Sequence, residues 1–229
     1  AERAVRACND HRVVLAVGHE KRFEPPIREL FRMAKMGELG TLLQVEANFS
    51  QNKFLALPKD NWRLSEQEAP AGPMTATGIH LLDLAIGLLG PAATAYASVR
   101  QLGSRLANGD TLAALVSHKS GAHSLISAML ATPFEGRFAL YGTKGWVEVR
   151  DRAHPEAPQG WVATRTPASG EKSVQEYPPS NAVLANLEAF ADAAEGRAPY
   201  PVSQHDMIAN IAALEAVFRS ATTGRAESA

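Results

Sequence analysis

Apolar and polar residues alternate most regularly between positions 43 and 50. Every second residue from Leu43 to Phe49 is apolar and the residues between are polar, which predicts a half-buried strand. The same alternation returns at 93–100. Further short strands are predicted at Thr111–His118, His123–Leu130, Phe138–Tyr141, Trp146–Arg150, Trp161–Arg165 and Ser173–Tyr177. Successive short strands joined by tight turns are typical of an antiparallel sheet.

Apolar residues three and four positions apart predict helices between and after these strands. Residues Met74–Leu89 are apolar on nearly all sides, which predicts a buried helix that ends at Gly90. Other helices are predicted at Glu2–Asn9, from Pro25 to Gly37, after an N-cap at Ser180 with an apolar stripe of Val183, Leu184, Leu187 and Phe190, and after an N-cap at Ser203. The sequence therefore predicts an α+β fold, an open and mainly antiparallel sheet with helices packed on one face.

One apolar run does not fit this scheme. His11–Val17 is continuously apolar and β-branched after its first two residues, which predicts a buried strand of the kind found in parallel sheets. No parallel partner for it is predicted in the chain. In addition, one face of the antiparallel sheet remains to be covered, and this predicts contact with another copy or another domain.

Composition narrows the class of protein. The 229 residues are 45% hydrophobic and 21% charged, which is ordinary globular usage. A formal net charge of −1 argues against nucleic acid or an anionic membrane as the main partner. The one cysteine, Cys8, excludes an internal disulfide and a multi-thiolate zinc site, and it fits the reducing cytoplasm. No spacing of residues predicts a metal site.

The apolar segment 74–89 carries two titratable side chains, His80 and Asp83. They are three residues apart and therefore lie on the same side of the predicted helix. One interpretation is a hydrogen-bonded core histidine beside a helix-stabilising aspartate. The other is a general acid/base that faces a substrate pocket, because histidine alone titrates near neutral pH without assistance.

Two further groups carry possible chemistry. The charged residues His19 to Arg22 follow the apolar run 11–17, and ligands bind at the carboxyl ends of strands in open α/β sheets. Trp62-Arg63 offers a stacking plane beside a fixed cation. The alternatives are a solvated loop for the first group and a packed tryptophan beside a surface arginine for the second. No dinucleotide, Walker or nucleophile-elbow motif occurs.

Taken in order, these segments resemble the C-terminal half of the glucose–fructose oxidoreductase/inositol dehydrogenase (Gfo/Idh/MocA) family. The resemblance covers nearly the whole chain and rests on an ordered set of short motifs: Val17-Gly18-His19-x-x-Arg22-Phe23-x-Pro25, Gly37-x-x-Gly40, Trp62-Arg63, Gly78-x-His80-x-x-Asp83, Leu89-Gly90, Gly142-Thr143-Lys144-Gly145 and Pro201-Val202.

The resemblance implies a two-domain enzyme that oxidises or reduces sugars, inositols or similar polyols with NAD or NADP, as a homodimer or homotetramer built through the sheet. Residues 1–22 would be a remnant, the last helix and strand, of an N-terminal dinucleotide-binding domain. Residues 23–229 would be the C-terminal substrate and oligomerisation domain. Most of the dinucleotide-binding domain, with the family's active-site lysine, is expected upstream of Ala1.

Carried over by position, His80 matches the family's catalytic histidine. His19 and Arg22 match positions near the cofactor–substrate junction, and Trp62 and Arg63 match a loop at the substrate site. Many members have aspartate four residues before the histidine, where this chain has Ala76. The resemblance therefore leaves Asp83 as a candidate substrate-site residue that orients His80.

The chain on its own is expected to be inactive, because nothing in it would position a nicotinamide ring against the substrate. Turnover of NAD(P) by the isolated 229 residues would contradict this. A second hypothesis makes the chain a stand-alone assembly or ligand-binding module without catalysis, and Ala76 favours it. The retained Arg22, Trp62-Arg63 and His80 favour the enzyme.

Overall fold

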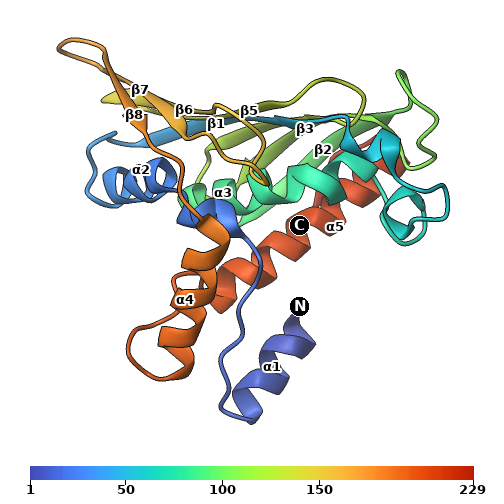
Figure 1. The fold of residues 1–229 in the computed structure, drawn as a ribbon, viewed down its shortest axis with the longest axis horizontal. Coiled ribbons are helices and arrows are strands. Elements are labelled where there is room, and N and C mark those ends of the chain that lie inside the picture. Colours follow the sequence, from blue (N-terminus) through green and yellow to red (C-terminus); the bar gives the residue numbers. More distant parts are fainter.

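A computed structural model describes residues 1–229 and contains one nine-stranded sheet, in the order β8-β7-β6-β5-β1-β4-β3-β2-β9 (Figure 1). Neighbouring strands are antiparallel except β1 and β4, which pair in parallel at the centre. The strands are β1 Leu42–Ser50, β2 Ala92–Arg100, β3 Thr111–His118, β4 His123–Met129, β5 Glu135–Gly142, β6 Gly145–Asp151, β7 Trp161–Pro167, β8 Ser173–Tyr177 and β9 Glu227–Ser228. The predicted mainly antiparallel sheet is confirmed.

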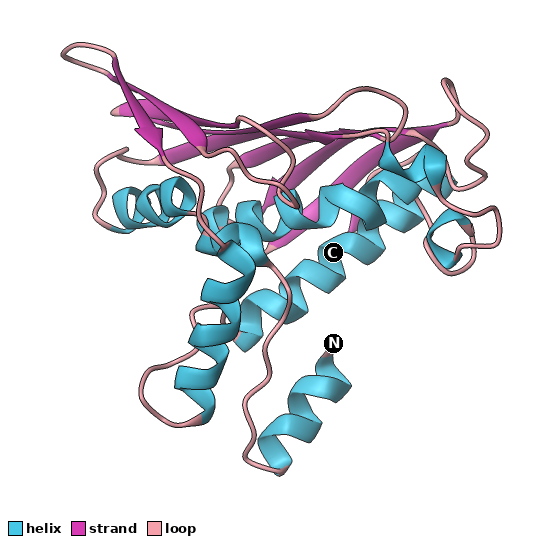
Figure 2. Cartoon of the chain, in the orientation of Figure 1, coloured by secondary structure: helices cyan, strands magenta, loops and turns pink.

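The helices lie on one side of this sheet, as predicted (Figure 2). They are α1 Glu2–Asp10, α2 Pro25–Lys35, α3 Ile79–Leu89, α4 Ala182–Ala194 and α5 Gln204–Thr223. The Ser203 hydroxyl accepts a hydrogen bond from the Asp206 amide and caps α5. The cap of α4 is Asn181, one residue beyond the predicted Ser180, because the Asn181 side chain reaches the Leu184 amide. None of these helices has both the length and the hydropathy that spanning a membrane requires.

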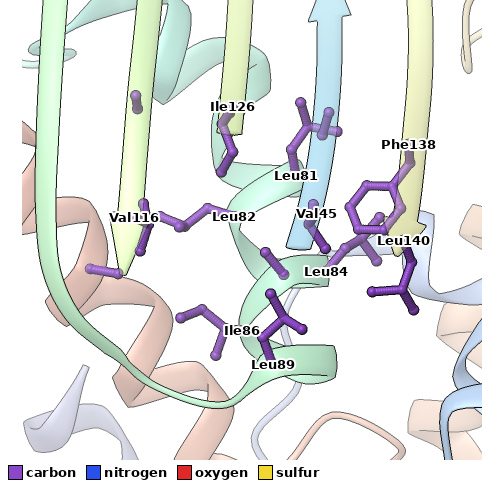
Figure 3. Packing of buried hydrophobic residues seen from close by; sticks show 14 of the residues in the cluster. Val45, Leu81, Leu82, Leu84, Ile86, Leu89, Val116, Ile126, Phe138 and Leu140 are labelled. Atoms are coloured by element: carbon purple, nitrogen blue, oxygen red, sulfur yellow. The ribbon is translucent and has the colours of Figure 1, made fainter. Parts of the chain in front are cut away.

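Helix α3 forms the centre of the core between the sheet and α5. Its side chains Leu81, Leu82, Leu84, Ile86 and Leu89 are at most 4% exposed. They pack against residues of four strands, Val45, Val116, Ile126, Phe138 and Leu140 (Figure 3). Each such side chain contributes about 1.5–3 kcal/mol by burial. This packing fixes the rotation of α3, and with it the directions of His80 and Asp83.

The predicted helix over 74–89 begins with a wide π-helical turn, Met74–Gly78, and becomes α-helical only from Ile79. The Thr77 hydroxyl donates to the carbonyl oxygens of Phe49, at 2.8 Å, and Pro73, at 3.2 Å. Through the Phe49 bond, the start of the helix is attached to the end of β1. Turns of this type often occur at functional sites, and this one immediately precedes His80.

The predicted strand His11–Val17 does not form. Residues 13–19 belong to no helix or strand, and Val13 is 55% exposed. The Val17 carbonyl instead accepts hydrogen bonds from the side chains of Asn186 and Tyr200. A strand requires a neighbouring strand that forms hydrogen bonds with its backbone N–H and C=O groups. The nine-stranded sheet provides no such neighbour for this segment. The division into 1–22 and 23–229 remains a prediction.

Candidate active site around His80

His80 lies in the first turn of α3, where α3, the end of β1 and the 3₁₀ turn Glu20–Phe23 (η1) meet. Its Nδ1 is 4.0 Å from Glu20 Oε2. The His19 ring stands edge-on to the His80 ring at a centroid distance of 5.6 Å, and the Phe49 ring is 6.5 Å away. The His80 side chain is 21% exposed. The imidazole is therefore mostly enclosed, with a limited opening to the surface.

Its surroundings favour the neutral form of His80. Burial lowers the pKa of His80 below its ordinary value of 6.5; His19 and Lys21 also lower it, while Glu20 and Asp83 act in the opposite direction. The ring is consequently neutral at pH 7 and can accept a proton. A neutral imidazole in a partly open site is the state that a general base requires.

Three buried polar atoms at this site lack a hydrogen-bond partner: Nδ1 of His80, Nδ1 of His19 and Oδ1 of Asn210. The Asn210 side chain on α5 is joined to His19 Nε2 at 3.1 Å, so the three residues form one cluster. Buried polar groups are nearly always paired in folded proteins. Their unused donors and acceptors mark this cluster as a candidate site.

Arg22 and Asp83 form a buried ion pair beside this cluster. Arg22 Nε and Nη2 donate to the two Asp83 carboxylate oxygens at 2.6 and 2.9 Å, and Nη1 donates to Asp206 at 3.0 Å. A Cβ atom at Gly87 would lie 2.8 Å from Arg22 Cζ, so the guanidinium approaches α3 closely because position 87 is glycine. Arg22 thus joins η1, α3 and α5.

Asp83 makes no hydrogen bond to His80, because its carboxylate is held by Arg22 and lies 3.8 Å from His19 Nε2. Residues three apart on a helix share a side, but they need not point into the same space. Direct ligand binding by Arg22 and Asp83 remains a prediction. In this structure both side chains satisfy each other and are almost fully buried.

A second buried network on η1 was not predicted from the sequence. Lys21 Nζ lies 3.0 Å from Glu24 Oε1 and 3.2 Å from Asp151 Oδ1, and Trp161 Nε1 donates to the same Asp151 oxygen. Burial lowers the pKa of Lys21, but the two carboxylates raise it above its ordinary value. Burial raises the pKa of Glu24 to about 7. The Lys21 ammonium thus faces the carboxylates of Glu24 and Asp151. The Glu24 carboxylate takes up a proton near neutral pH.

Trp62 and Arg63 lie in the 3₁₀ turn Trp62–Leu64, outside the cluster of His19, His80 and Asn210. The Arg63 guanidinium stacks on the Trp62 ring at 4.5 Å, and the Trp62 side chain is about half exposed. No hydrogen bond, ion pair or ring contact joins either residue to His80. Their predicted role at the substrate site remains a prediction.

A cleft of about 390 Å³ opens beside the Glu20 side chain. Its walls come from η1, the loop before β7 and the start of α4, and include Glu20, Glu24, Glu156, Trp161, Ser180 and Asn181. These groups can accept or donate several hydrogen bonds. Ligand-sized space therefore adjoins Glu20, whose carboxylate lies 4.0 Å from His80 Nδ1, although His80 itself does not line this cleft.

Comparison with known proteins identifies the family. Residues 27–148, more than half of the chain, match the GFO/IDH/MocA C-terminal domain. The chain belongs to the Gfo/Idh/MocA family. Family membership confirms the resemblance inferred from the ordered motifs. Named Gfo/Idh/MocA homologues are dehydrogenases and oxidoreductases, which places this chain in a family of enzymes.

Individual Gfo/Idh/MocA relatives match nearly all of this chain. D-apiose dehydrogenase of Rhizobium rhizogenes is 26% identical over 98% of this chain and 67% of its own length. D-xylose 1-dehydrogenase (NADP(+)) 2 of Haloferax volcanii is 24% identical over 96% of this chain and 66% of its own. The fold is similar to aldose-aldose oxidoreductase from Caulobacter crescentus in complex with glycerol, with a TM-score of 0.83 and 22% identity over 98% and 67% of the two chains. The chain spans about two thirds of the length of these relatives.

Proposed function

We propose that the protein is an NAD(P)-dependent oxidoreductase that acts on the hydroxyl or carbonyl group of a sugar, inositol or similar polyol, with His80 as its general acid/base. The observation that carries this proposal is the neutral, mostly buried His80 ring with an unpaired Nδ1, next to the unpaired polar atoms of His19 and Asn210. The names of the sugar dehydrogenases among its relatives support the substrate class.

The residues present fit such chemistry. A nicotinamide cofactor, when bound, supplies the acceptor for the hydride that leaves the substrate carbon. His80 accepts the proton of the substrate hydroxyl, or returns it in the reverse direction. His19 and Asn210 offer unpaired nitrogen and oxygen atoms to the cofactor–substrate junction. Arg22 and Asp83 hold η1 against α3, so the imidazole and its neighbours keep their places without ligand.

The proposal includes the division of the chain into 1–22, a remnant of a dinucleotide-binding domain, and 23–229. Its support is the segment 13–17, which has the composition of a strand but pairs with no strand of the sheet. The single cysteine, Cys8, supports a cytoplasmic location.

A substrate screen tests the proposed activity. Full-length protein is incubated with a panel of aldoses, inositols and linear polyols, each with NAD⁺ and with NADP⁺, and nicotinamide reduction is followed at 340 nm. We expect turnover with at least one polyol and a preference for one of the two cofactors. Absence of turnover with every pair, from protein that binds either cofactor, would contradict the proposal.

The face of the sheet opposite the helices is proposed to contact a second copy of the chain. On it lies a shallow hollow of about 440 Å³, where the small residues Ala113 and Ser127 adjoin a row of exposed side chains, Tyr96, Leu115 and Leu125. An exposed apolar area of this kind is typical of an interface between subunits.

Substitution on this face is expected to change the oligomeric state. Leu125→Arg places a charge in the lining of the hollow and should shift a dimer or tetramer towards monomer, as measured by size-exclusion chromatography with light scattering. Leu102→Arg is the matched control, because Leu102 is 74% exposed in the segment that follows β2. An equal effect of both substitutions, or a monomeric unsubstituted protein, would argue against this interface.

A further inference from the structure

We propose that Glu20 is the positioning residue of His80: its carboxylate orients the imidazole and stabilises the protonated ring that forms during turnover. This inference rests on the proposed function. It concerns a residue that lies in the charged group His19 to Arg22 but to which the sequence assigned no role of its own.

The geometry singles out Glu20. Its Oε2 lies 4.0 Å from His80 Nδ1, and that nitrogen is buried without a hydrogen-bond partner. The Glu20 side chain is itself 24% exposed and makes no hydrogen bond or other ion pair, so its carboxylate is free to close on the ring. A small rotation of either side chain brings the two atoms within hydrogen-bond reach.

No other carboxylate can take this role. Asp83, on the helix of His80, is held in two hydrogen bonds by Arg22 and is 1% exposed. Four residues before His80, on the preceding turn, Ala76 has no titratable side chain. The remaining charged or titratable groups that face His80 are His19 and Lys21, and Lys21 is bound to Glu24 and Asp151.

The neighbours of Glu20 keep it in place. Lys21 is anchored to Asp151 on β6, and Arg22 is anchored to Asp83 on α3 and Asp206 on α5. The two residues that follow Glu20 are therefore fixed on both sides of η1. Glu20 itself has no partner other than the nearby His80 ring, and it also lines the cleft beside Trp161.

This arrangement has a chemical consequence. With Nδ1–H directed at the Glu20 carboxylate, Nε2 keeps its lone pair and can accept the substrate hydroxyl proton. The resulting imidazolium lies in a largely desolvated place, where a carboxylate about 4 Å away stabilises it far more than it would in water. Glu20 thereby lowers the energy of the protonated state without touching the substrate.

The test compares Glu20→Gln and Glu20→Asp with Glu156→Gln as the matched control. Glu156 lines the same cleft, but its partners are Lys53 and His154. The first readout is NMR titration of the His80 imidazole in full-length protein, with resonances assigned by comparison with His80→Asn. We expect Glu20→Gln to lower the His80 pKa, Glu20→Asp to restore it in part, and Glu156→Gln to leave it unchanged.

The second readout is the pH profile of kcat/KM with the substrate found in the screen. Glu20→Gln should lower kcat/KM about 10- to 100-fold, less than the loss of the acid/base itself, and should move the acidic limb to lower pH. Thermal unfolding of each variant checks that the fold is intact. An unchanged His80 pKa in folded Glu20→Gln would overturn the inference. Because the titration needs no turnover, that outcome is distinct from a failure of the proposed activity.

Discussion

Replacement of His80 by Asn is expected to lower kcat of the full-length protein by about 10²–10⁴-fold, the usual contribution of one general acid/base. Asparagine is close in size and polar, but it cannot take up a proton near neutral pH. The dissociation constant of the cofactor should change little, because His80 acts on the substrate hydroxyl. Steady-state kinetics and a cofactor titration by fluorescence measure the two quantities.

His205→Asn serves as the control for this substitution. His205 is also in the first turn of a helix, α5, but its side chain is 72% exposed and makes no hydrogen bond, ion pair or ring contact with His19, His80 or Asn210. We expect its kcat to equal that of the unsubstituted protein. A His80→Asn variant that folds normally and turns over at the unsubstituted rate would remove His80 from the mechanism.

The largest expected effect on stability is that of Lys21→Met. The substitution leaves Asp151 and Glu24 buried without their cation, and breaking a buried ion pair by removing one partner costs about 3–5 kcal/mol. The free energy of unfolding from urea denaturation at pH 7 should fall by that amount. A loss below about 1 kcal/mol, the range of exposed ion pairs, would show that this network contributes little.

Glu24→Gln is expected to change the free energy of unfolding in the opposite direction to Lys21→Met, because it stabilises the protein at high pH. Burial raises the pKa of Glu24 from 4.5 to about 7, so the folded protein favours the protonated carboxyl. The stability from this group is present below pH 4.5 and is lost as the pH rises through about 7. The variant should therefore match the unsubstituted protein near pH 4 and exceed its stability at pH 8. Equal stability at both pH values would contradict the raised pKa.

Regular periodicity made much of the fold predictable. The alternation over 43–50 corresponds to β1, and the all-round apolar segment 74–89 contains the central helix α3. In contrast, β9 has two residues, too few for any period. The segment 11–17, predicted as a strand, forms none here, because apolar composition indicates an environment but cannot supply a pairing partner.

The apolar stripe of α4 also shows that a sequence pattern does not identify the partner of an apolar surface. Val183, Leu184, Leu187 and Phe190 have helical spacing, yet all four are between 37% and 58% exposed. Periodicity predicts that one side of this helix is apolar. It does not identify what covers that side.

Two residues of the candidate site were identified from the sequence, but its contacts were not. His80 and His19 were both identified from the sequence, and the structure brings their rings together. The partner of Asp83 is Arg22, 61 positions away, and Lys21 pairs with Asp151 across 130 positions. Such pairs depend on how η1 packs against α3 and β6, and no local spacing encodes that packing.

The most direct test of the proposed role of His80 is a crystal structure of the full-length protein with a nicotinamide cofactor and a polyol substrate. We expect the reacting hydroxyl oxygen within about 2.6–3.2 Å of His80 Nε2, the reach of a general base. A substrate bound with its reacting carbon against the nicotinamide but with its hydroxyl out of reach of His80, directly and through a water molecule, would contradict the account.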